Sequence, residues 1–302
     1  MKPVDTALIC GNRHQDGYIS SIDNLLDLLQ KAGIKLLVER PFLEYLRLSG
    51  LPLPDAVPCD PSDPRPEVAI SIGGDGTLLR TLRRIGRRQT PVLGINTGHL
   101  GFLASYSLDE TDELIKAILN PVVTVEPRML LHIECAGMPD DFWPYALNEV
   151  AFMKSYTSSM LNVRTWIDGH YLTDYLADGL IVATPTGSTA YNLSVGGPIL
   201  DPTLRAMVLS PIAPHSLTMR PLVVRGDSEI SAAVFSKANN YRVSIDGRQF
   251  TMSCCTQGKT CDPQVKITRA DVVVNIMRRP DSHFSEILRN KLLWGRATIS
   301  LA

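Results

Sequence analysis

Short apolar runs alternate with amphipathic stretches along the first 120 residues of the chain. One stretch predicts a helix ending at Gly33, because its apolar side chains recur at i, i+3, i+4 and i+7: Ile22, Leu25, Leu26 and Leu29. Similar patterns predict strands over residues 6–10, 34–38, 67–72 and 92–96, and helices over 77–85 and 108–119, the last capped by Ser107. Strands alternating with helices are typical of a parallel sheet with crossover helices. We therefore expect a Rossmann-like α/β domain over residues 1–121.

The pattern changes after residue 121, where short β-branched or alternating runs are separated by Gly, Pro and Asp. These runs predict a mainly β domain over residues 122–277. Its expected strands include residues 130–135, 163–167, 180–183, 222–224, 229–234, 242–245, 265–267 and 272–276. A last helical stripe lies within residues 278–302, formed by Phe284, Ile287, Leu288 and Leu292. Because a lone amphipathic helix must bury its stripe, we expect this C-terminal helix to pack back on the N-terminal domain.

Composition and charge narrow the class of protein. The chain has 302 residues, with 30 Lys and Arg against 31 Asp and Glu, a formal net charge of −1. Such a balance argues against a nucleic-acid partner bound by long-range attraction to phosphates. No run approaches the roughly 18 apolar residues of a membrane span, so we expect no membrane partner and a cytoplasmic location. The six cysteines lack paired C-x-x-C spacing, and we expect them to be reduced thiols.

The most informative segment is Gly73-Gly74-Asp75-Gly76-Thr77, which joins an expected buried strand to an expected helix. Glycines permit positive φ and close approach of a ligand, and the N–H groups at a helix start attract anions such as phosphate. The segment is neither a G-x-x-x-x-G-K-[ST] loop nor a full dinucleotide fingerprint. A simple tight turn at Asp75-Gly76 is the alternative, but hairpin turns join two strands, and here a helix follows.

Asp75 gives this segment a chemical meaning. A carboxylate inside a phosphate-binding turn would repel its ligand unless it had a task there. The task that fits is to orient, or accept the proton of, an alcohol that attacks a phosphoryl group.

The chain also carries four further motifs in order: NTGHLGF at residues 96–102, NE at 148–149, DG at 178–179 and TPTGSTAY at 184–191. With GGDGT at 73–77, this combination resembles the NAD kinase family, from about residue 5 to residue 295. GGDGT alone is less specific, because lipid kinases and phosphofructokinases have similar turns.

The resemblance implies an activity and its partners. Members of the family phosphorylate the 2′-hydroxyl of the adenosine ribose of NAD, using ATP or in some cases polyphosphate, with a divalent metal, to give NADP. Mg²⁺ is the expected metal, held mainly by the phosphates of the donor, and we expect no dedicated metal ligands in the chain. The family is usually homo-oligomeric, so the resemblance also implies a dimer or tetramer.

The resemblance assigns roles to individual residues. Asp75 corresponds to the proton acceptor, and the remaining expected contacts are to substrate. The turn and the helix after it would contact phosphate through Gly73, Gly74, Gly76, Thr77 and Arg80. The nucleotide would be contacted by Asn148, Glu149, Asp178, Thr189, Ala190, Tyr191, Asn192, Leu193, Ser194, Asp246 and Arg248.

Alternatives remain open for several of these positions. On pattern alone, Asn148-Glu149 fits an exposed strand turn, Tyr191 fits a core residue and Arg80 fits a solvated helix position. Many bacterial members have an Arg two residues before the Asp-Gly step, where this chain has Leu176, so a cationic contact to the dinucleotide is missing or supplied elsewhere. A lipid kinase and a non-catalytic dinucleotide-binding regulator are the alternative functions.

Overall fold

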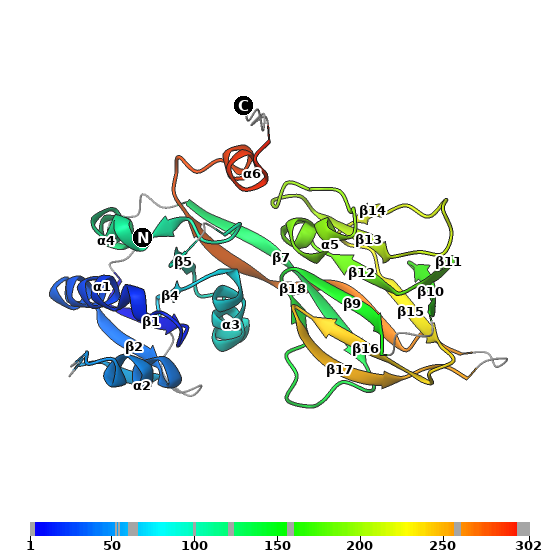
Figure 1. The fold of residues 1–302 in the computed structure, drawn as a ribbon, viewed down its shortest axis with the longest axis horizontal. Coiled ribbons are helices and arrows are strands. Elements are labelled where there is room, and N and C mark those ends of the chain that lie inside the picture. The colour runs from blue at the N-terminus through cyan, green and yellow to red at the C-terminus, as the bar shows by residue number, and fades with distance from the viewer. Residues whose placement is uncertain are drawn as a thin grey trace, which may run out of the picture. The chain divides into compact units, whose positions relative to one another are not determined.

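The computed structural model describes residues 4–51, 53, 55–59, 66–98, 101–119, 124–155, 160–256 and 261–294. The chain forms two compact units: unit 1 comprises Met1–Pro127 and Val274–Ala302, and unit 2 comprises Arg128–Val273 (Figure 1). Two long strands, β7 (Thr124–Cys135) and β18 (Val265–Arg278), run from one unit into the other.

Unit 1 is an α/β unit with a parallel sheet, as the sequence predicts. Its strands are β1 (Thr6–Gly11), β2 (Lys35–Glu39), β3 (Val57–Cys59), β4 (Val68–Ile72), β5 (Val92–Asn96) and β6 (Tyr106–Ser107). They pair in the order β3-β2-β1-β4-β5, all parallel, and the end of β18 also pairs parallel with β5. Its helices are α1 (Ile19–Lys31), α2 (Arg40–Leu48), α3 (Asp75–Ile85), α4 (Thr111–Leu119) and α6 (Phe284–Leu292), with 3-10 turns η1 (Asp16–Tyr18), η2 (Gly86–Arg88) and η3 (Leu108–Glu110).

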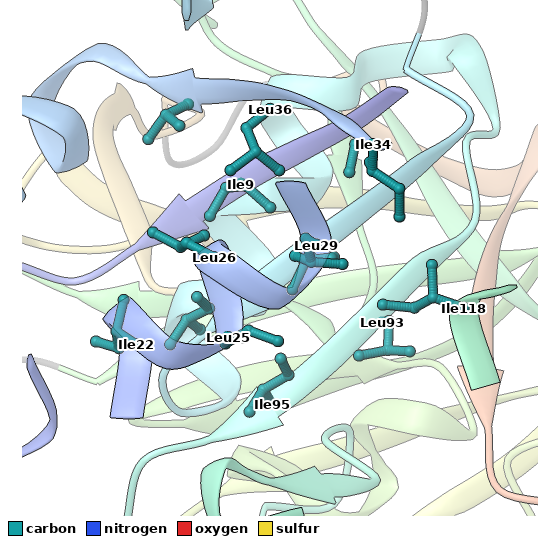
Figure 2. Packing of buried hydrophobic residues seen from close by; sticks show 14 of the residues in the cluster. Ile9, Ile22, Leu25, Leu26, Leu29, Ile34, Leu36, Leu93, Ile95 and Ile118 are labelled. Carbon is teal, nitrogen blue, oxygen red and sulfur yellow. The ribbon is translucent and has the colours of Figure 1, made fainter. Parts of the chain in front are cut away.

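The core of unit 1 forms where α1 meets the sheet. The predicted stripe of α1, from Ile22 to Leu29, is buried and packs with Ile9, Leu36, Leu93 and Ile95 from the strands (Figure 2). Each such aliphatic side chain contributes about 1.5–3 kcal/mol when it is withdrawn from water. This packing fixes the strand ends at which the glycine turn begins.

In unit 1 one predicted helix cap is confirmed, and one short helix was not predicted. Ser107 caps η3 as predicted, because its hydroxyl accepts from the Asp109 N–H and Glu110 completes a capping box. Helix α2 is not predicted by the sequence reading. It buries only Phe42, Leu43 and Leu46, which is too short a stripe to show a clear period.

Unit 2 is mainly β, as predicted. A six-stranded antiparallel sheet has the order β14-β13-β12-β9-β16-β17, while β11, β10, β15 and the first part of β18 pair in a second antiparallel set. The elements are β8 (Tyr145–Ala146), β9 (Glu149–Lys154), β10 (Leu161–Ile167), β11 (His170–Ala177), β12 (Gly179–Ala183), η4 (Thr186–Thr189), α5 (Tyr191–Ser194), β13 (Ala206–Ile212), β14 (Leu222–Arg225), β15 (Ile230–Phe235), β16 (Asn240–Ile245) and β17 (Arg248–Ser253).

The C-terminal helix α6 belongs to unit 1, which confirms the predicted return of the chain. Ile287 and Leu288 of its stripe are buried, and Lys291 Nζ lies 5.9 Å from the centre of the Phe102 ring. Among the described helices of the whole chain, none is both long enough and apolar enough to cross a membrane.

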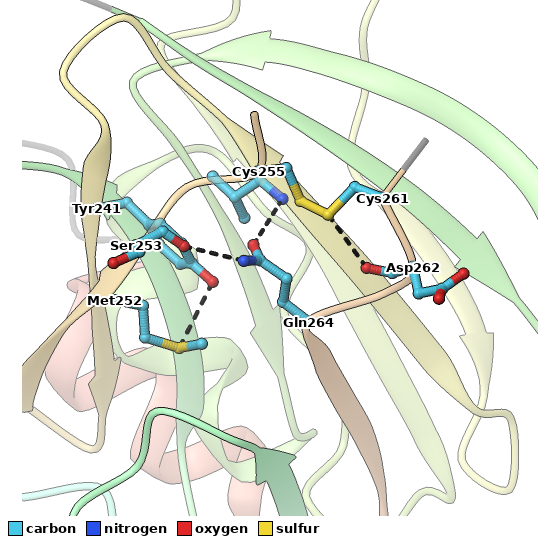
Figure 3. The surroundings of a disulfide bond; sticks show 8 residues. Tyr241, Met252, Ser253, Cys255, Cys261, Asp262 and Gln264 are labelled. Atoms are coloured by element: carbon cyan, nitrogen blue, oxygen red, sulfur yellow. Dashed lines mark hydrogen bonds between the residues drawn. A yellow bond between two sulfur atoms is a disulfide. The ribbon is translucent and has the colours of Figure 1, made fainter. Parts of the chain in front are cut away.

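The prediction of six reduced thiols is wrong for two cysteines. Cys255 and Cys261 form a disulfide with a Cα–Cα distance of 6.0 Å (Figure 3). The Cys255 N–H donates to the carbonyl of Val234, which holds this cysteine against β15. A spacing of six residues carries no sequence signal for this pairing.

Candidate active site

The glycine turn, Gly73–Thr77, follows β4 directly and starts α3. Gly73 has φ +145°, and a Cβ there would lie 2.5 Å from Thr77 Oγ1, so this position requires glycine. The Gly73 N–H donates to the Ile95 carbonyl at 2.8 Å and is therefore engaged within the fold. Gly74 and Gly76 are exposed, and a Cβ on either would meet no atom within 4 Å. The open backbone at the start of α3 is thus at Gly74 and Gly76.

Asp75 is the first residue of α3 and is half-buried. Its Oδ2 accepts from the Phe102 N–H at 3.0 Å, and its Oδ1 accepts from the Leu103 N–H at 3.3 Å. Phe102 is the last residue of the NTGHLGF segment and Leu103 follows it, so the structure joins two of the sequence motifs within unit 1. The sequence reading missed them because backbone N–H groups leave no residue-type signal.

Arg80 is engaged by protein groups. Its guanidinium donates to the Gly11 carbonyl and lies 3.8 Å from Glu39 Oε2. The side chain is 38% exposed, so it is neither freely solvated nor buried. Its expected contact with phosphate stays a prediction.

In unit 2, Asn148, Glu149 and Asp246 form one cluster. Asp246 occupies the turn between β16 and β17 at φ +47°, and its carboxylate accepts three backbone N–H bonds. The donors are Leu147 at 2.7 Å, Asn148 at 2.8 Å and Glu149 at 3.1 Å. Asp246 therefore fixes the main chain at the start of β9, where the NE motif lies.

Glu149 is a buried carboxyl group with an unusual proton affinity. Burial, followed by the negative charge of Asp246, raises the pKa of Glu149 from 4.5 to about 8, while the Tyr191 N–H bond opposes the rise. Burial also raises the pKa of Asp246, against the three N–H bonds it accepts. Glu149 Oε2 has no hydrogen-bond partner within the described part of the chain. Burial and the neighbouring Asp246 thus favour the protonated form of Glu149, while the three N–H donors favour the charged form of Asp246.

The TPTGSTAY segment packs directly on this cluster. A Cβ on Gly187 would overlap the carbonyl of Asn148 and come within 2.6 Å of its Cα, so this close approach requires glycine. Tyr191 N–H reaches Glu149, while the Tyr191 side chain is 37% exposed, which rules out the core alternative. Thr189, Ala190 and Leu193 are half-buried beside it, and Ser194 is exposed.

Asn192 has a structural place within this segment. Its side chain is fully buried: Nδ2 donates to the carbonyls of Ser188 at 3.0 Å and Pro198 at 3.1 Å, and Oδ1 accepts from Ser210 Oγ at 2.7 Å. All of these bonds are to the protein, and a direct substrate contact by Asn192 stays a prediction.

Replacing Asn192 tests this structural role. We expect Asn192→Ala to lower the free energy of unfolding by about 2 kcal/mol, because it leaves buried partners of three hydrogen bonds unsatisfied. Urea unfolding would measure the loss. Ser194→Ala, at an exposed position of the same short helix, is the matched control, and equal losses in the two variants would contradict the assignment.

One expected nucleotide contact, Asp178, lies apart from the cluster in unit 2. Asp178 pairs with Lys154 at 2.7 Å, and the register places this pair at the opposite end of β9 from Glu149. Arg248 lies beside the cluster, where its charge acts on Asp246; it donates to the Trp143 carbonyl at 2.8 Å, and its guanidinium lies 4.1 Å from the centre of the Phe142 ring. Leu176, two residues before Asp178, is 43% exposed.

No group of three or more His, Cys, Asp or Glu side chains that could hold a metal ion occurs among the residues that the structure describes.

Comparison with known proteins places these features in a family. Residues 59–123 match the ATP-NAD kinase N-terminal domain, and residues 147–257 match the ATP-NAD kinase C-terminal domain. A protein of Porphyromonas gingivalis named NAD kinase is 44% identical over 293 residues, which cover 96% of this chain and 98% of that protein. A Bacteroides fragilis protein of the same name is 43% identical over 291 residues, or 95% of this chain and 97% of that protein.

Two solved structures share the fold. The crystal structure of yeast NADH kinase complexed with NADH matches with a TM-score of 0.83 and 23% identity, covering 100% of this chain and 91% of that one. The structure of an NAD kinase from Archaeoglobus fulgidus in complex with ATP matches with a TM-score of 0.69 and 26% identity, covering 95% and 98%. These matches, together with the fold, define the class of protein: a kinase built from an α/β unit and a β unit. Within that class, the chain belongs to the NAD kinase family.

Proposed function

We propose that this protein transfers the terminal phosphoryl group of ATP to the 2′-hydroxyl of the adenosine ribose of NAD, giving NADP. The observation that carries the proposal is the Asp75 carboxylate, half-buried at the start of α3 between two exposed glycines. Family membership supports the identity of the acceptor, and the ATP complex of the Archaeoglobus fulgidus relative supports ATP as the donor.

In the proposed reaction, the 2′-oxygen of the ribose attacks the γ-phosphorus of ATP. The bond from that phosphorus to the bridging oxygen breaks, ADP leaves, and the hydroxyl proton passes to the Asp75 carboxylate. A carboxylate is a weak base for an alcohol, so the proton moves late, as the phosphoryl group arrives. Orientation of the hydroxyl therefore supplies most of the contribution of Asp75.

The glycine turn would bind the negative charge of the donor. The exposed backbone at Gly74 and Gly76 lets a phosphate approach the start of α3, where the N–H groups and the helix dipole favour an anion. Thr77, buried behind the turn, leaves no room for a side chain at Gly73, whose positive φ also favours glycine.

The residues present fit a divalent metal that is bound mainly through ATP. Asp75 is the carboxylate nearest the open glycines, and it would be the first candidate for a direct or water-mediated contact with the metal. Mg²⁺ keeps several waters and needs few protein ligands, and when bound it offsets charge on the phosphate oxygens.

The cluster in unit 2 would recognise the dinucleotide. The side chains of Asn148 and Glu149, supported by Asp246, would bond ribose hydroxyls, and the exposed Tyr191 ring offers a face on which adenine can stack. A neutral Glu149 can both donate and accept a hydrogen bond, which suits a hydroxyl partner.

The proposal is tested by assaying the purified protein for NADP. NAD, NADH and diacylglycerol are offered as acceptors, and ATP and polyphosphate as donors, with Mg²⁺ and Mn²⁺ compared. We expect NADP from NAD with ATP and a divalent metal, and none when EDTA is present. Phosphorylation of the lipid alone, or saturable NAD binding with no product from any donor, would overturn the proposal. A homo-oligomer and a cytoplasmic location stay predictions, and light scattering at micromolar concentration would test the first.

A further inference from the structure

We propose that Gly101 and Arg278 are positioning residues for the Asp75 carboxylate: Gly101 by leaving room for it, and Arg278 through the peptide group between Phe102 and Leu103. The inference rests on the proposed function, because it concerns the residue assigned there as proton acceptor. It adds two residues that have no part in the roles given above.

The first support is the hydrogen bonding of the carboxylate itself. Phe102 and Leu103 donate to different oxygens of Asp75, at 3.0 Å and 3.3 Å. Donors on both oxygens fix the plane of the carboxylate as well as its position. A carboxylate can accept about four hydrogen bonds, so each oxygen keeps a site for a substrate hydroxyl. The two N–H groups therefore hold the Asp75 carboxylate in place and still leave it able to accept a hydrogen bond from a substrate hydroxyl.

The second support is the close packing of Gly101 against that carboxylate. A Cβ built on Gly101 would overlap Asp75 Oδ1 and lie within 2.7 Å of the carboxyl carbon. Gly101 is buried, so a side chain there has little open space on its other sides. Gly98, two residues after β5, differs: a Cβ there would meet no atom within 4 Å. Glycine is thus required at residue 101 by the presence of the Asp75 side chain.

The third support is the buried ion pair that holds the same peptide from its other side. Arg278 Nη2 donates to the Phe102 carbonyl at 2.9 Å, and Arg278 Nε lies 3.3 Å from Glu126 Oε2. The Arg278 side chain is only 4% exposed, whereas Glu126 is 27% exposed. The carbonyl that accepts from Arg278 and the N–H that donates from Leu103 to Asp75 belong to one peptide group.

Arg278 forms no bond with Asp75, but it influences the hydrogen bond that the Leu103 N–H donates to the Asp75 carboxylate. A cation on the carbonyl polarises the peptide and strengthens its N–H as a donor. Because a peptide group is planar, fixing its carbonyl also fixes the direction of its N–H. Glu126, Arg278, the Phe102–Leu103 peptide and Asp75 thus form a continuous chain of polar contacts within unit 1.

The main test is a double-mutant cycle between Gly101 and Asp75. In the parent protein, we expect Gly101→Ala to lower kcat for NADP formation by about 10²-fold, as for a misplacement of about 1 Å, while KM for NAD stays within about threefold. We also expect the urea midpoint to fall in the parent and to change little in an Asp75→Ala background, where the overlapping atoms are gone. Gly98→Ala is the matched control for the urea midpoint, which should stay at the parental value.

A second variant, Arg278→Lys, tests the pair of Arg278 with Glu126 while keeping the positive charge at residue 278. Lys at position 278 cannot reproduce the planar fork that reaches both Glu126 and the Phe102 carbonyl. We expect Arg278→Lys to lower kcat by about 3- to 10-fold with KM for NAD unchanged. The matched control is Arg279→Lys at the next residue, whose guanidinium pairs with Glu110, Glu113 and Asp281, and its kcat should stay parental.

Three results would overturn the inference: parental kcat in Gly101→Ala, an equal loss of urea midpoint in both backgrounds, or an effect of Arg278→Lys on KM alone. Failure of the proposed function gives a different signature. In that case the parent forms no NADP from any donor, while the urea cycle still reports whether Gly101 and Asp75 are coupled.

Discussion

Asp75→Asn is expected to lower turnover of NAD to NADP by at least about 10²-fold, while NAD affinity stays within several-fold of the parental value. The amide cannot accept the hydroxyl proton. It also presents an N–H₂ group to one of the two backbone donors, Phe102 or Leu103, so the side chain loses its fixed orientation. Initial rates of NADP formation and a titration of NAD binding measure the two quantities separately.

Asp112 provides the matched control for this variant. It is an exposed carboxylate in the first turn of α4, so Asp112→Asn makes the same chemical change at another helix start in unit 1. Its turnover should be parental. Turnover near the parental value in Asp75→Asn as well would show that the carboxylate only shapes the turn.

The second large effect is the pH dependence of stability that Glu149 creates. The folded protein holds the Glu149 proton up to a pKa of about 8, whereas the unfolded chain releases it near the ordinary value of 4.5. Folding therefore takes up a proton between these values, and the contribution of Glu149 to stability is lost as pH rises towards 8. In Glu149→Gln this loss is absent, because the amide stays neutral at every pH.

We expect the stability of Glu149→Gln relative to the parent to increase from pH 5 to pH 8, by at most about 4 kcal/mol. Urea unfolding at four pH values would measure it. Glu44→Gln, at an exposed position on α2, serves as the control and should keep the parental pH dependence. The same dependence in Glu149→Gln as in the parent would mean that Glu149 is ionised in the folded protein.

The class of fold could be predicted because local patterns determine it. The stripe from Ile22 to Leu29 has a helical period, and the runs of unit 1 are apolar throughout, as strands of a covered parallel sheet are. Strand β18 shows the limit of this reasoning. The pattern suggests two strands, residues 265–267 and 272–276, whereas the structure has one strand of 14 residues in which the buried positions shift by one residue between 267 and 270.

The candidate site was predictable where side chains carry the chemistry. GGDGT could be found from residue types and NE only from the family resemblance, and the structure gives both a supported backbone. The contacts that connect motifs could not be found this way. The bonds from Phe102 and Leu103 to Asp75 come from main-chain groups, and the disulfide of Cys255 has no paired-cysteine spacing in the sequence.

For some polar residues, the motif suggests a contact with substrate although their side chains form hydrogen bonds within the protein. Asn192 lies inside a recognisable segment, yet its amide bonds Ser188, Pro198 and Ser210. A motif preserves residues that shape a site as well as those that touch a ligand, and only the hydrogen-bond partners separate the two.

The most direct measurement is a crystal structure of the protein with NAD and a non-hydrolysable ATP analogue. The account predicts the 2′-hydroxyl of the adenosine ribose within hydrogen-bond distance, about 2.6–3.2 Å, of an Asp75 carboxylate oxygen that still accepts from the main chain at residues 102–103. A bound dinucleotide whose ribose lies far from Asp75, with that carboxylate bonded only to protein, would contradict it.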